Sequence, residues 1–346
     1  MRIAFVAENV SRAYSGGRVL AWFMVEGLLA LGHEVVIYTD GHPPFLSDVV
    51  YLCAMPRIEI VRPLSKLRLP AEYDLVCGFP ILAAEWALRE AQRIGVPCIN
   101  WVLDPHDMCK RYAPAVAGRM HYSETYRKAL HDSARLIACV EHAVPFIKRW
   151  TGNDDVKTVL GCVNSVIADS VQTERVPNRV VTVTRLTEHK NVPHMLEVIR
   201  ALGFARLHVI TSFSAPQIRQ MAQRMGIADL VVVHDTLSEA DKYELMKSAS
   251  VFLSASQYEG LGLPMLEAVY CGTPCVLYDF PVFHETVGKA ARYARYREVK
   301  SLADTLSTML GDQEVYQKHA QSAVEIGRRY RFEAMLPRLA NAIKLE

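Results

Sequence analysis

The sequence contains no uninterrupted run of about 18 apolar residues, the length that a membrane-spanning helix needs. It also lacks, at its start, the apolar leader and cleavage site of a secreted protein. Residues 1–6, Met-Arg-Ile-Ala-Phe-Val, are instead typical of a strand. We therefore expect a cytoplasmic protein with no helix that crosses a membrane.

An excess of charge of either sign is missing as well. The 346 residues include 39 Lys and Arg against 37 Asp and Glu, which gives a net charge of +2. Proteins that bind nucleic acid are usually strongly basic, so we expect no nucleic-acid partner. Apolar residues make up 51% of the chain and charged residues 22%, as in ordinary globular α/β proteins. Because the chain is longer than one compact core usually grows, two domains are expected.

The cysteines lack the spacing of a metal site or a disulfide framework. Eight are present, mostly inside apolar segments, and the one close pair is Cys271 and Cys275. We see no set of partner ligands near that pair that would complete a zinc site. We interpret the cysteines as buried free thiols in a reducing compartment. We expect neither a metal ion nor a bound cofactor.

Apolar strands and helical segments do alternate along the chain. A strand, a polar loop, a helix and a second strand follow one another over residues 2–39 and again over 179–211. Near-continuous apolar strands between helices are typical of a buried parallel sheet. The pattern predicts an α/β protein of the GT-B type, with two Rossmann-like doubly wound parallel-sheet domains facing each other across a cleft. The polar stretch 161–178 is the candidate linker.

The predicted strands cover residues 2–7, 33–39, 75–77, 98–102, 136–140, 179–184, 206–211, 230–234, 251–254 and 275–278. The predicted helices cover residues 18–31, 83–94, 122–133, 193–202, 239–248 and 264–270.

Two carboxylates eight residues apart, Glu259 and Glu267, bracket a turn rich in glycine. Glycines remove side chains, so the backbone amides of Gly260, Leu261, Gly262 and Leu263 can approach a ligand at the start of a helix. Carboxylates and amides together suit a neutral, hydroxyl-rich ligand that carries a phosphate. The alternative is a glutamate that the helix dipole stabilises and that has no function.

Several motifs resemble those of family 4 retaining glycosyltransferases, which belong to the glycosyl transferases group 1. The motifs are Thr184-Arg-Leu-Thr-Glu-His-Lys-Asn191, Glu259-Gly-Leu-Gly-Leu-Pro264, Leu266-Glu-Ala268, Cys271-Gly-Thr-Pro274 and Glu285-Thr-Val-Gly288. The resemblance implies transfer of a sugar, with retention of configuration, from a nucleotide-sugar donor and without a metal ion. It implies an N-terminal acceptor-binding domain over 1–165 and a C-terminal nucleotide-sugar-binding domain over 166–325. A C-terminal helix within 326–346 is expected to cross back to the first domain.

Two cations suit the departure of a nucleoside diphosphate. Arg185 follows a strand and Lys190 lies on the next loop, where parallel sheets bind ligands. A guanidinium and an ammonium held there would stabilise the charge that develops on the β-phosphate. The alternative is that both are solvated loop charges. Glu267 could accept hydrogen bonds from both ribose hydroxyls of the donor, and the resemblance places Glu259 beside the transferred sugar.

Three further residues are candidates in the first half of the chain. Gly16 and Gly17 follow the first strand, so their amides can face a phosphate or the acceptor. A nicotinamide site ending at Asp40 is the alternative, but the glycine spacing does not fit it. The resemblance implies that His106 contacts the transferred sugar. The competing interpretation is a loop histidine held by Asp104 or Asp107.

The segment 57–70 is basic, with four cations against the single carboxylate of Glu59. Its cations could attach the protein peripherally to the inner membrane face, at about 1 kcal/mol per residue. The alternative is a solvated loop whose leucines pack inward. The four cations are Arg57, Arg62, Lys66 and Arg68.

The sequence thus predicts a glycosyltransferase that moves a sugar from a nucleotide-sugar donor to a carbohydrate, lipid-linked or small-molecule acceptor. Two alternatives remain at this point. One is a nucleotide-sugar epimerase or glycosyl phosphorylase of the same fold. The other is a sugar-nucleotide-binding protein without catalytic activity.

Overall fold

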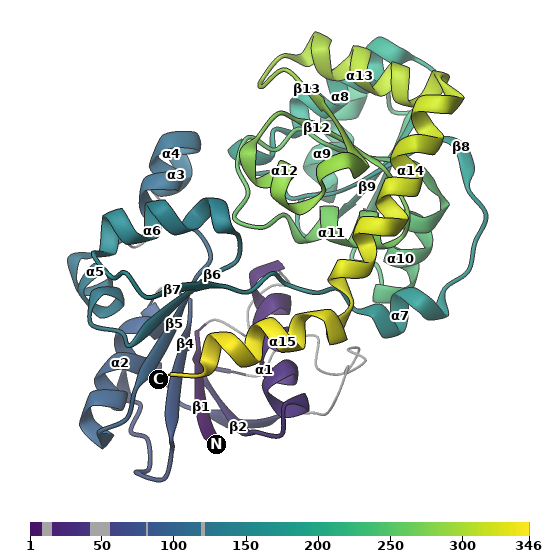
Figure 1. Ribbon diagram of the computed structural model, residues 1–346. Coiled ribbons are helices and arrows are strands. Elements are labelled where there is room, and N and C mark those ends of the chain that lie inside the picture. The colour runs from purple at the N-terminus through teal and green to yellow at the C-terminus, as the bar shows by residue number, and fades with distance from the viewer. Residues whose placement is uncertain (9–15, 42–55, 81, 119–121, 346) are drawn as a thin grey trace. The chain divides into compact units, whose positions relative to one another are not determined.

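The computed structural model describes residues 1–8, 16–41, 56–80, 82–118 and 122–345. Contacts divide the chain into two compact units, which are described separately below (Figure 1). Unit 1 comprises Met1–Cys162 and Phe332–Glu346, and unit 2 comprises Val163–Arg331. The predicted boundaries after residues 165 and 325 lie a few residues from these.

The sheet of unit 1 is parallel throughout its described strands, in the order β3-β2-β1-β4-β5-β6-β7. The two central strands β1 and β4 are almost entirely buried, as their apolar sequences require. The strands are β1 (Arg2–Ala7), β2 (Glu34–Thr39), β3 (Arg57–Ile60), β4 (Leu75–Phe79), β5 (Cys98–Val102), β6 (Arg135–Ala138) and β7 (Val156–Thr158).

Helices join and cover these strands, and the last helix of the chain is one of them. The helices of unit 1 are α1 (Gly16–Ala30), α2 (Leu82–Ile94), α3 (His106–Tyr112), α4 (Pro114–Ala117), α5 (Glu124–His131), α6 (Val144–Thr151) and α15 (Phe332–Ile343), with the short 3-10 turns η1 (Leu64–Lys66) and η2 (Glu141–Ala143).

The contact between α1 and α15 is close (Figure 1). Gly27 of α1 makes it possible, since a Cβ at that position would lie 2.6 Å from Leu339 Cδ2 and 2.9 Å from Met335 Cε. Leu339 and Met335 are themselves buried. The last helix is therefore part of the packed interior of unit 1.

The sheet of unit 2 is also parallel, in the order β10-β9-β8-β11-β12-β13. Its strands are β8 (Val176–Val183), β9 (Arg206–Thr211), β10 (Val231–Asp235), β11 (Ala249–Ser254), β12 (Cys275–Tyr278) and β13 (Ala291–Ala294). Its helices are α7 (Ser165–Ser170), α8 (Val192–Leu202), α9 (Ala215–Arg224), α10 (Glu239–Ser248), α11 (Leu263–Tyr270), α12 (Pro281–Thr286), α13 (Val299–Gly311) and α14 (Gln313–Gly327), with 3-10 turns η3 (Glu188–Lys190), η4 (Gly288–Ala290) and η5 (Arg328–Tyr330).

One face of this second sheet packs its valines and leucines against α8, α9 and α13. The opposite face contacts α10, next to which α11 lies. Covering both faces explains why β11 is buried at every residue. The sheet thus presents its loops, rather than its faces, for binding.

Most predicted elements are confirmed, and five of them, β1, β5, β9, β12 and α10, have the predicted bounds. The prediction missed β3, β7 and β13, each of which forms the edge of a sheet. The crossing between the two units, after Cys162, lies inside the candidate linker 161–178. The same stretch also contains α7 and the first residues of β8.

The predicted state of the cysteines is confirmed for those that the structure describes. Each has a free thiol and is buried: Cys77, Cys98, Cys109, Cys139, Cys162, Cys271 and Cys275. Within the described ranges, the chain has no helix whose length and apolar character would let it cross a membrane.

Candidate functional site

The carboxyl ends of β8 and β11 carry most of the predicted site residues. These two strands are parallel neighbours, so the loops that follow them emerge at the same edge of the sheet. A backbone hydrogen bond of 2.8 Å from Gln257 N to His189 O joins the two loops. Residues far apart in the sequence, at 185–190 and 257–263, are thereby brought together.

Lys190 and Glu259 form an ion pair in this position. Lys190 Nζ lies 2.6 Å from Glu259 Oε1, and the two side chains are only 15% and 11% exposed. In so sheltered a place each charge needs a partner, and the pair provides it. An ammonium group has three donor hydrogens, so Lys190 can keep Glu259 and still bind a phosphate oxygen. The sequence analysis predicted both residues as site residues, but it did not predict that they contact each other.

Arg185 begins the loop that carries Lys190, and its side chain is exposed. The loop is tied down around it, since Thr187 N donates to Arg185 O at 2.8 Å and Leu186 N donates to Ser214 Oγ at 3.1 Å. The guanidinium is therefore open to solvent on a backbone that has fixed contacts. Within the described ranges its guanidinium has no ion pair to break, so it can bind an incoming anion directly.

The turn before α11 has the conformation that its glycines suggest. Gly262 is the residue before the first turn of the helix and has a left-handed backbone with φ of 82°. In the part of the chain that the structure describes, no side chain caps this helix start. The amides from Gly260 to Leu263 thus lie beside Glu259 at a helix N-terminus, where anions and sugar hydroxyls are readily bound.

Glu267 lies one turn further along α11 and is 3% exposed. Burial raises the pKa of this carboxyl above its ordinary value, and the neighbouring Lys242 ammonium opposes the rise. Lys242 Nζ lies 2.8 Å from Glu267 Oε1 and 2.6 Å from Glu239 Oε1. The sequence analysis missed Lys242. Its position directly after the Ser238–Asp241 helix start gave no signal that it would point toward a residue 25 positions away.

His106 belongs to unit 1, where it begins α3. Its Nδ1 lies 2.8 Å from Asp107 Oδ1, and its ring stacks on Trp150 at a centroid distance of 5.1 Å. The ring also meets Tyr122 edge-on at 4.9 Å. The contact with Asp107 is the one that the structural alternative expects. Contact of His106 with a sugar stays a prediction.

Gly16 and Gly17 form the first turn of α1, also in unit 1. A Cβ on Gly17 would lie 3.1 Å from Leu103 Cδ1, so the start of α1 packs against the loop that follows β5. Since His106 lies three residues after Leu103, the start of α1 lies beside the loop that leads into His106 and α3. Their role with a phosphate or an acceptor stays a prediction.

The basic segment 57–70 is held by contacts that the sequence did not predict. Arg57 pairs with Glu59 at 2.7 Å, and Arg62 Nε donates to Asp40 O at 2.7 Å. The leucines Leu64, Leu67 and Leu69 are buried, as the structural alternative expects. Lys66 is exposed.

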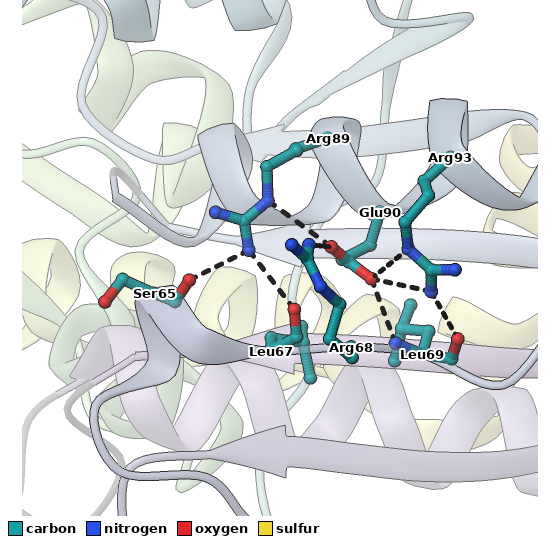
Figure 2. A network of polar contacts seen from close by, with 7 residues as sticks. All are labelled: Ser65, Leu67, Arg68, Leu69, Arg89, Glu90 and Arg93. Carbon is teal, nitrogen blue, oxygen red and sulfur yellow. Dashed lines mark hydrogen bonds and ion pairs between the residues drawn. The ribbon is translucent and has the colours of Figure 1, made fainter.

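Arg68 joins a larger network around Glu90 of α2, shown in Figure 2. The Glu90 side chain is fully buried, and it binds Arg68 at 2.8 Å, Arg93 at 2.8 Å and Arg89 at 3.3 Å. Leu69 N donates to Glu90 Oε2 at 3.0 Å. Arg89 and Arg93 in turn donate to carbonyl oxygens of the basic segment, at residues 65, 67 and 69 (Figure 2). With three guanidiniums and one carboxylate, the network keeps a net charge of about +2 at pH 7.

No group of three or more His, Cys, Asp or Glu side chains suited to a metal ion occurs within the described ranges. The chemistry that unit 2 offers is instead that of cations, carboxylates and free amides. Arg185 and Lys190 can neutralise a diphosphate, while Glu259 and Glu267 can accept hydrogen bonds from hydroxyl groups.

Comparisons with known proteins agree with this geometry. Residues 167–328 match the family described as glycosyl transferases group 1. The MMP alpha-(1->4)-mannosyltransferase of Mycolicibacterium hassiacum is 24% identical over 379 aligned positions, which cover 90% of this chain and 89% of that protein.

Two solved structures are similar in fold. Sucrose-phosphate synthase of Thermosynechococcus elongatus matches with a TM-score of 0.79 at 17% identity, over 98% of this chain and 97% of that one. HepE of Anabaena, in complex with UDP and glucose, matches with a TM-score of 0.78 at 16% identity, over 99% and 98%.

The two parallel sheets and these neighbours define the class of the protein, which has the GT-B fold. Residues 167–328 match the glycosyl transferases group 1, and together with the relatives named as mannosyltransferases this match identifies the chain as a glycosyltransferase.

Proposed function

We propose that the chain transfers a hexosyl group from a nucleoside-diphosphate sugar to an acceptor hydroxyl, with retention of configuration and without a metal ion. The observation that carries this proposal is the sheltered Lys190–Glu259 pair. Its lysine lies on the same loop as the exposed Arg185, and its glutamate lies beside the amides of 260–263. It supplies cations for a diphosphate and acceptors for sugar hydroxyls at one edge of one sheet.

The chemical step follows from these groups. The bond between the sugar C1 and the β-phosphate oxygen breaks, and a bond from C1 to the acceptor oxygen forms on the same face of the sugar. The departing phosphate oxygen takes the acceptor proton, so no separate general base is needed. Lys190 and Arg185 stabilise the negative charge that grows on the phosphate, and this stabilisation is largest in the transition state.

Glu259 has a double role in the proposal. It holds Lys190 in place before the donor arrives, at the 2.6 Å distance given above. Its second oxygen accepts hydrogen bonds from the transferred sugar, which binds beside Gly260–Leu263. Glu267, deeper in α11, accepts hydrogen bonds from the ribose hydroxyls through the small part of its side chain that is exposed.

The relative from Mycolicibacterium hassiacum is named as a mannosyltransferase, and HepE is described with UDP and glucose. We propose a hexose of the mannose or glucose type as the transferred sugar. The acceptor is proposed to be a carbohydrate, either free, lipid-linked or attached to a small molecule.

Product analysis tests this function. The protein is incubated with UDP-glucose, GDP-mannose and related donors, a panel of sugar acceptors, and EDTA. We expect a glycoside whose anomeric configuration, measured by NMR, equals that of the donor, at a rate that EDTA leaves unchanged. An inverted product or a loss of activity in EDTA would contradict the proposed mechanism.

Two control reactions separate the alternative activities. An epimerase would change the donor sugar when no acceptor is present, and a glycosyl phosphorylase would need inorganic phosphate. Tight nucleotide binding without transfer or donor hydrolysis, over the whole acceptor panel, would indicate a protein that only binds its ligand.

We also propose that the basic surface around 62–69 contacts an anionic membrane face by charge alone. Arg62, Lys66 and the Glu90 network leave it net positive, while its leucines are buried and cannot insert. Attachment to vesicles containing phosphatidylserine should therefore disappear in about 0.5 M salt, where screening is strong. Binding that survives such salt would contradict a purely electrostatic contact.

A further inference from the structure

Helix α10 provides the partners of Glu267, although α11 carries the carboxylate. Lys242 Nζ lies 2.8 Å from Glu267 Oε1, with the two side chains only 7% and 5% exposed. The neighbouring Tyr243 also gives Glu267 a hydrogen bond. Both contacts favour the ionised carboxylate, whereas burial alone would favour the neutral acid.

The ammonium of Lys242 is shared between two carboxylates. Glu239, one turn before Lys242 on α10, lies 2.6 Å from the same Nζ and is 17% exposed. The cluster of Glu239, Lys242 and Glu267 therefore contains two negative charges and one positive charge when all three are ionised. Glu239 raises the pKa of Glu267, and Lys242 lowers it.

The charge of Glu267 matters for a ligand with two neighbouring hydroxyl groups. An ionised carboxylate has two acceptor oxygens, so it can accept from both hydroxyls of a ribose at once. A protonated carboxyl uses one oxygen as a donor and loses the stronger, charge-assisted bonds. Any group that shifts the pKa of Glu267 therefore shifts the affinity for the nucleotide.

Three other titratable groups near α11 do not change charge in the useful pH range. Burial raises the pKa of Cys271, the residue after α11, to about 12, and it raises that of Cys275 on β12. Burial also raises the pKa of Tyr243 well above its ordinary value. All three stay neutral near pH 7. The response of Glu267 to pH thus depends on the carboxylates and the lysine of the cluster.

The cluster is rigidly held from a third side. The Tyr243 hydroxyl accepts a hydrogen bond of 3.2 Å from Asn164 N, and Asn164 caps α7 by accepting from Ile167 N. Tyr243 is fully buried. Tyr243 thereby ties α10 to the start of α7 as well as to Glu267 of α11, which holds Lys242 in the cluster.

We propose that Lys242 and Glu239 set the affinity for the donor nucleotide by opposite effects on the charge of Glu267. Neither residue needs to touch the donor: Lys242 is a positioning residue that keeps Glu267 ionised and oriented, and Glu239 limits that effect. The inference rests on the proposed function, in which Glu267 binds the ribose.

The experiment compares four variants with the wild type: Lys242→Met, Glu239→Gln, the double variant carrying both changes, and Glu267→Gln. Dissociation constants for UDP and for GDP are measured by calorimetry between pH 5.5 and 8.5. In Lys242→Met the pKa of Glu267 rises, so affinity should fall about tenfold for each pH unit below that new value and recover above it. In Glu239→Gln the pKa falls, so tight binding should extend to lower pH than in the wild type.

Lys247→Met is the matched control. Lys247 lies on the same helix, but its Nζ donates to Val171 O at 2.8 Å, and we expect an unchanged pH profile. The kinetic effect of Lys242→Met should appear as a raised KM for the donor with a nearly constant kcat, and Lys242→Arg should restore most of the affinity. Lys242→Met leaves the carboxylates of Glu239 and Glu267 close together without a cation, and this variant could fail to fold. The double variant removes the charge of Glu239 and still lacks the ammonium, so it tests the same effect.

The outcomes separate the inference from the proposed function. If Glu267→Gln weakens nucleotide binding while Lys242→Met and the double variant keep the wild-type pH profile, the inference is wrong and the function stands. If Glu267→Gln binds UDP and GDP as the wild type does, Glu267 does not bind the ribose, and both the assigned role and the inference fail.

Discussion

Glu90 shows how one buried carboxylate can order a whole segment of chain. Its two oxygens bind the Leu69 amide and three guanidiniums, two of which also bind carbonyl oxygens of residues 65–69. Burial tends to raise the pKa of Glu90, but the hydrogen bonds from Leu69, Arg93 and Arg68 outweigh it, so the pKa lies below its ordinary value. The ionised form therefore stabilises the folded state.

Glu90→Gln should lower the free energy of unfolding of unit 1 by about 1–3 kcal/mol at pH 7, the range for hydrogen bonds to charged groups. The exposed guanidiniums keep the value moderate because solvent screens them. The stability due to the low pKa is present above the unfolded-state value, about 4.5, and is lost as pH falls through the folded-state value. The difference between variant and wild type should therefore shrink as the pH falls below the unfolded-state value.

Urea denaturation followed by tryptophan fluorescence measures this effect, because all four tryptophans lie in unit 1: Trp22, Trp86, Trp101 and Trp150. Glu124→Gln is the control, since Glu124 forms an exposed surface pair with Arg127. Such pairs contribute about 0–1 kcal/mol. A Glu90 variant no less stable than this control would contradict the role of the network.

At the scale of an element, the turn that starts α11 has a left-handed backbone conformation and lies beside the site residue Glu259. Gly262 has a φ of 82°, and a Cβ there would lie 3.1 Å from Met265 Sδ and 3.8 Å from Glu259 Cγ. A side chain at Gly262 would disturb both the left-handed turn and the environment of Glu259. Gly226, after α9, has a similar φ of 69°, but a Cβ there would meet nothing within 4 Å.

Gly262→Ala and Gly226→Ala should each cost about 1–2 kcal/mol of stability, because both put an alanine in the left-handed region. Only Gly262→Ala should also lower transfer activity, by about tenfold or more, since it moves the amides beside Glu259. Thermal unfolding and initial rates, measured on both variants, test this. Equal losses of activity in the two would show that strain alone is responsible.

The sequence predicted elements best where burial imposes a simple pattern. The strands β5, β9 and β12 are short apolar runs flanked by loops, and their bounds were predicted correctly. The missed strand β3, Arg57–Ile60, alternates charged and apolar residues at a sheet edge and is partly exposed, so its four residues resemble a loop. An edge strand such as β3 can be recognised only from its pairing with a neighbouring strand, which is β2 in this case.

The site was predictable as a set of residue types but not as a set of contacts. Glycines and glutamates at 259–267 form a local pattern that the sequence displays directly. The pairs Lys190–Glu259 and Lys242–Glu267 join residues 69 and 25 positions apart, which only the packing of the loops and helices brings together. For the same reason Glu90 gave no signal, although it organises a segment more than 20 residues away.

At the scale of the whole molecule, α15 belongs to the interior of unit 1, and it packs on α1 at Gly27. Gly27→Val should lower the stability of unit 1 by about 1–3 kcal/mol, because the added side chain would overlap Leu339 and Met335. The control is Gly311→Val in α13, where a Cβ meets nothing within 4 Å.

Tryptophan fluorescence during urea denaturation reports the first variant, and circular dichroism reports the overall unfolding of both. A Gly27 variant as stable as the wild type would mean that α15 can shift away from α1 without loss. Loss of stability in the Gly311 variant alone would point to helix propensity, rather than packing, as the dominant effect.

The placement of α15 also has a consequence for the order in which the protein folds during synthesis. Unit 2 is one continuous stretch, Val163–Arg331, so all of its residues are available as soon as that stretch has left the ribosome. Unit 1 begins first but needs Phe332–Ile343, which is translated after the whole of unit 2. The usual order, in which N-terminal domains fold first, is therefore reversed in its last step. Until then the groove that α15 fills on α1 is open, and nascent chains are most vulnerable there to aggregation or chaperone capture.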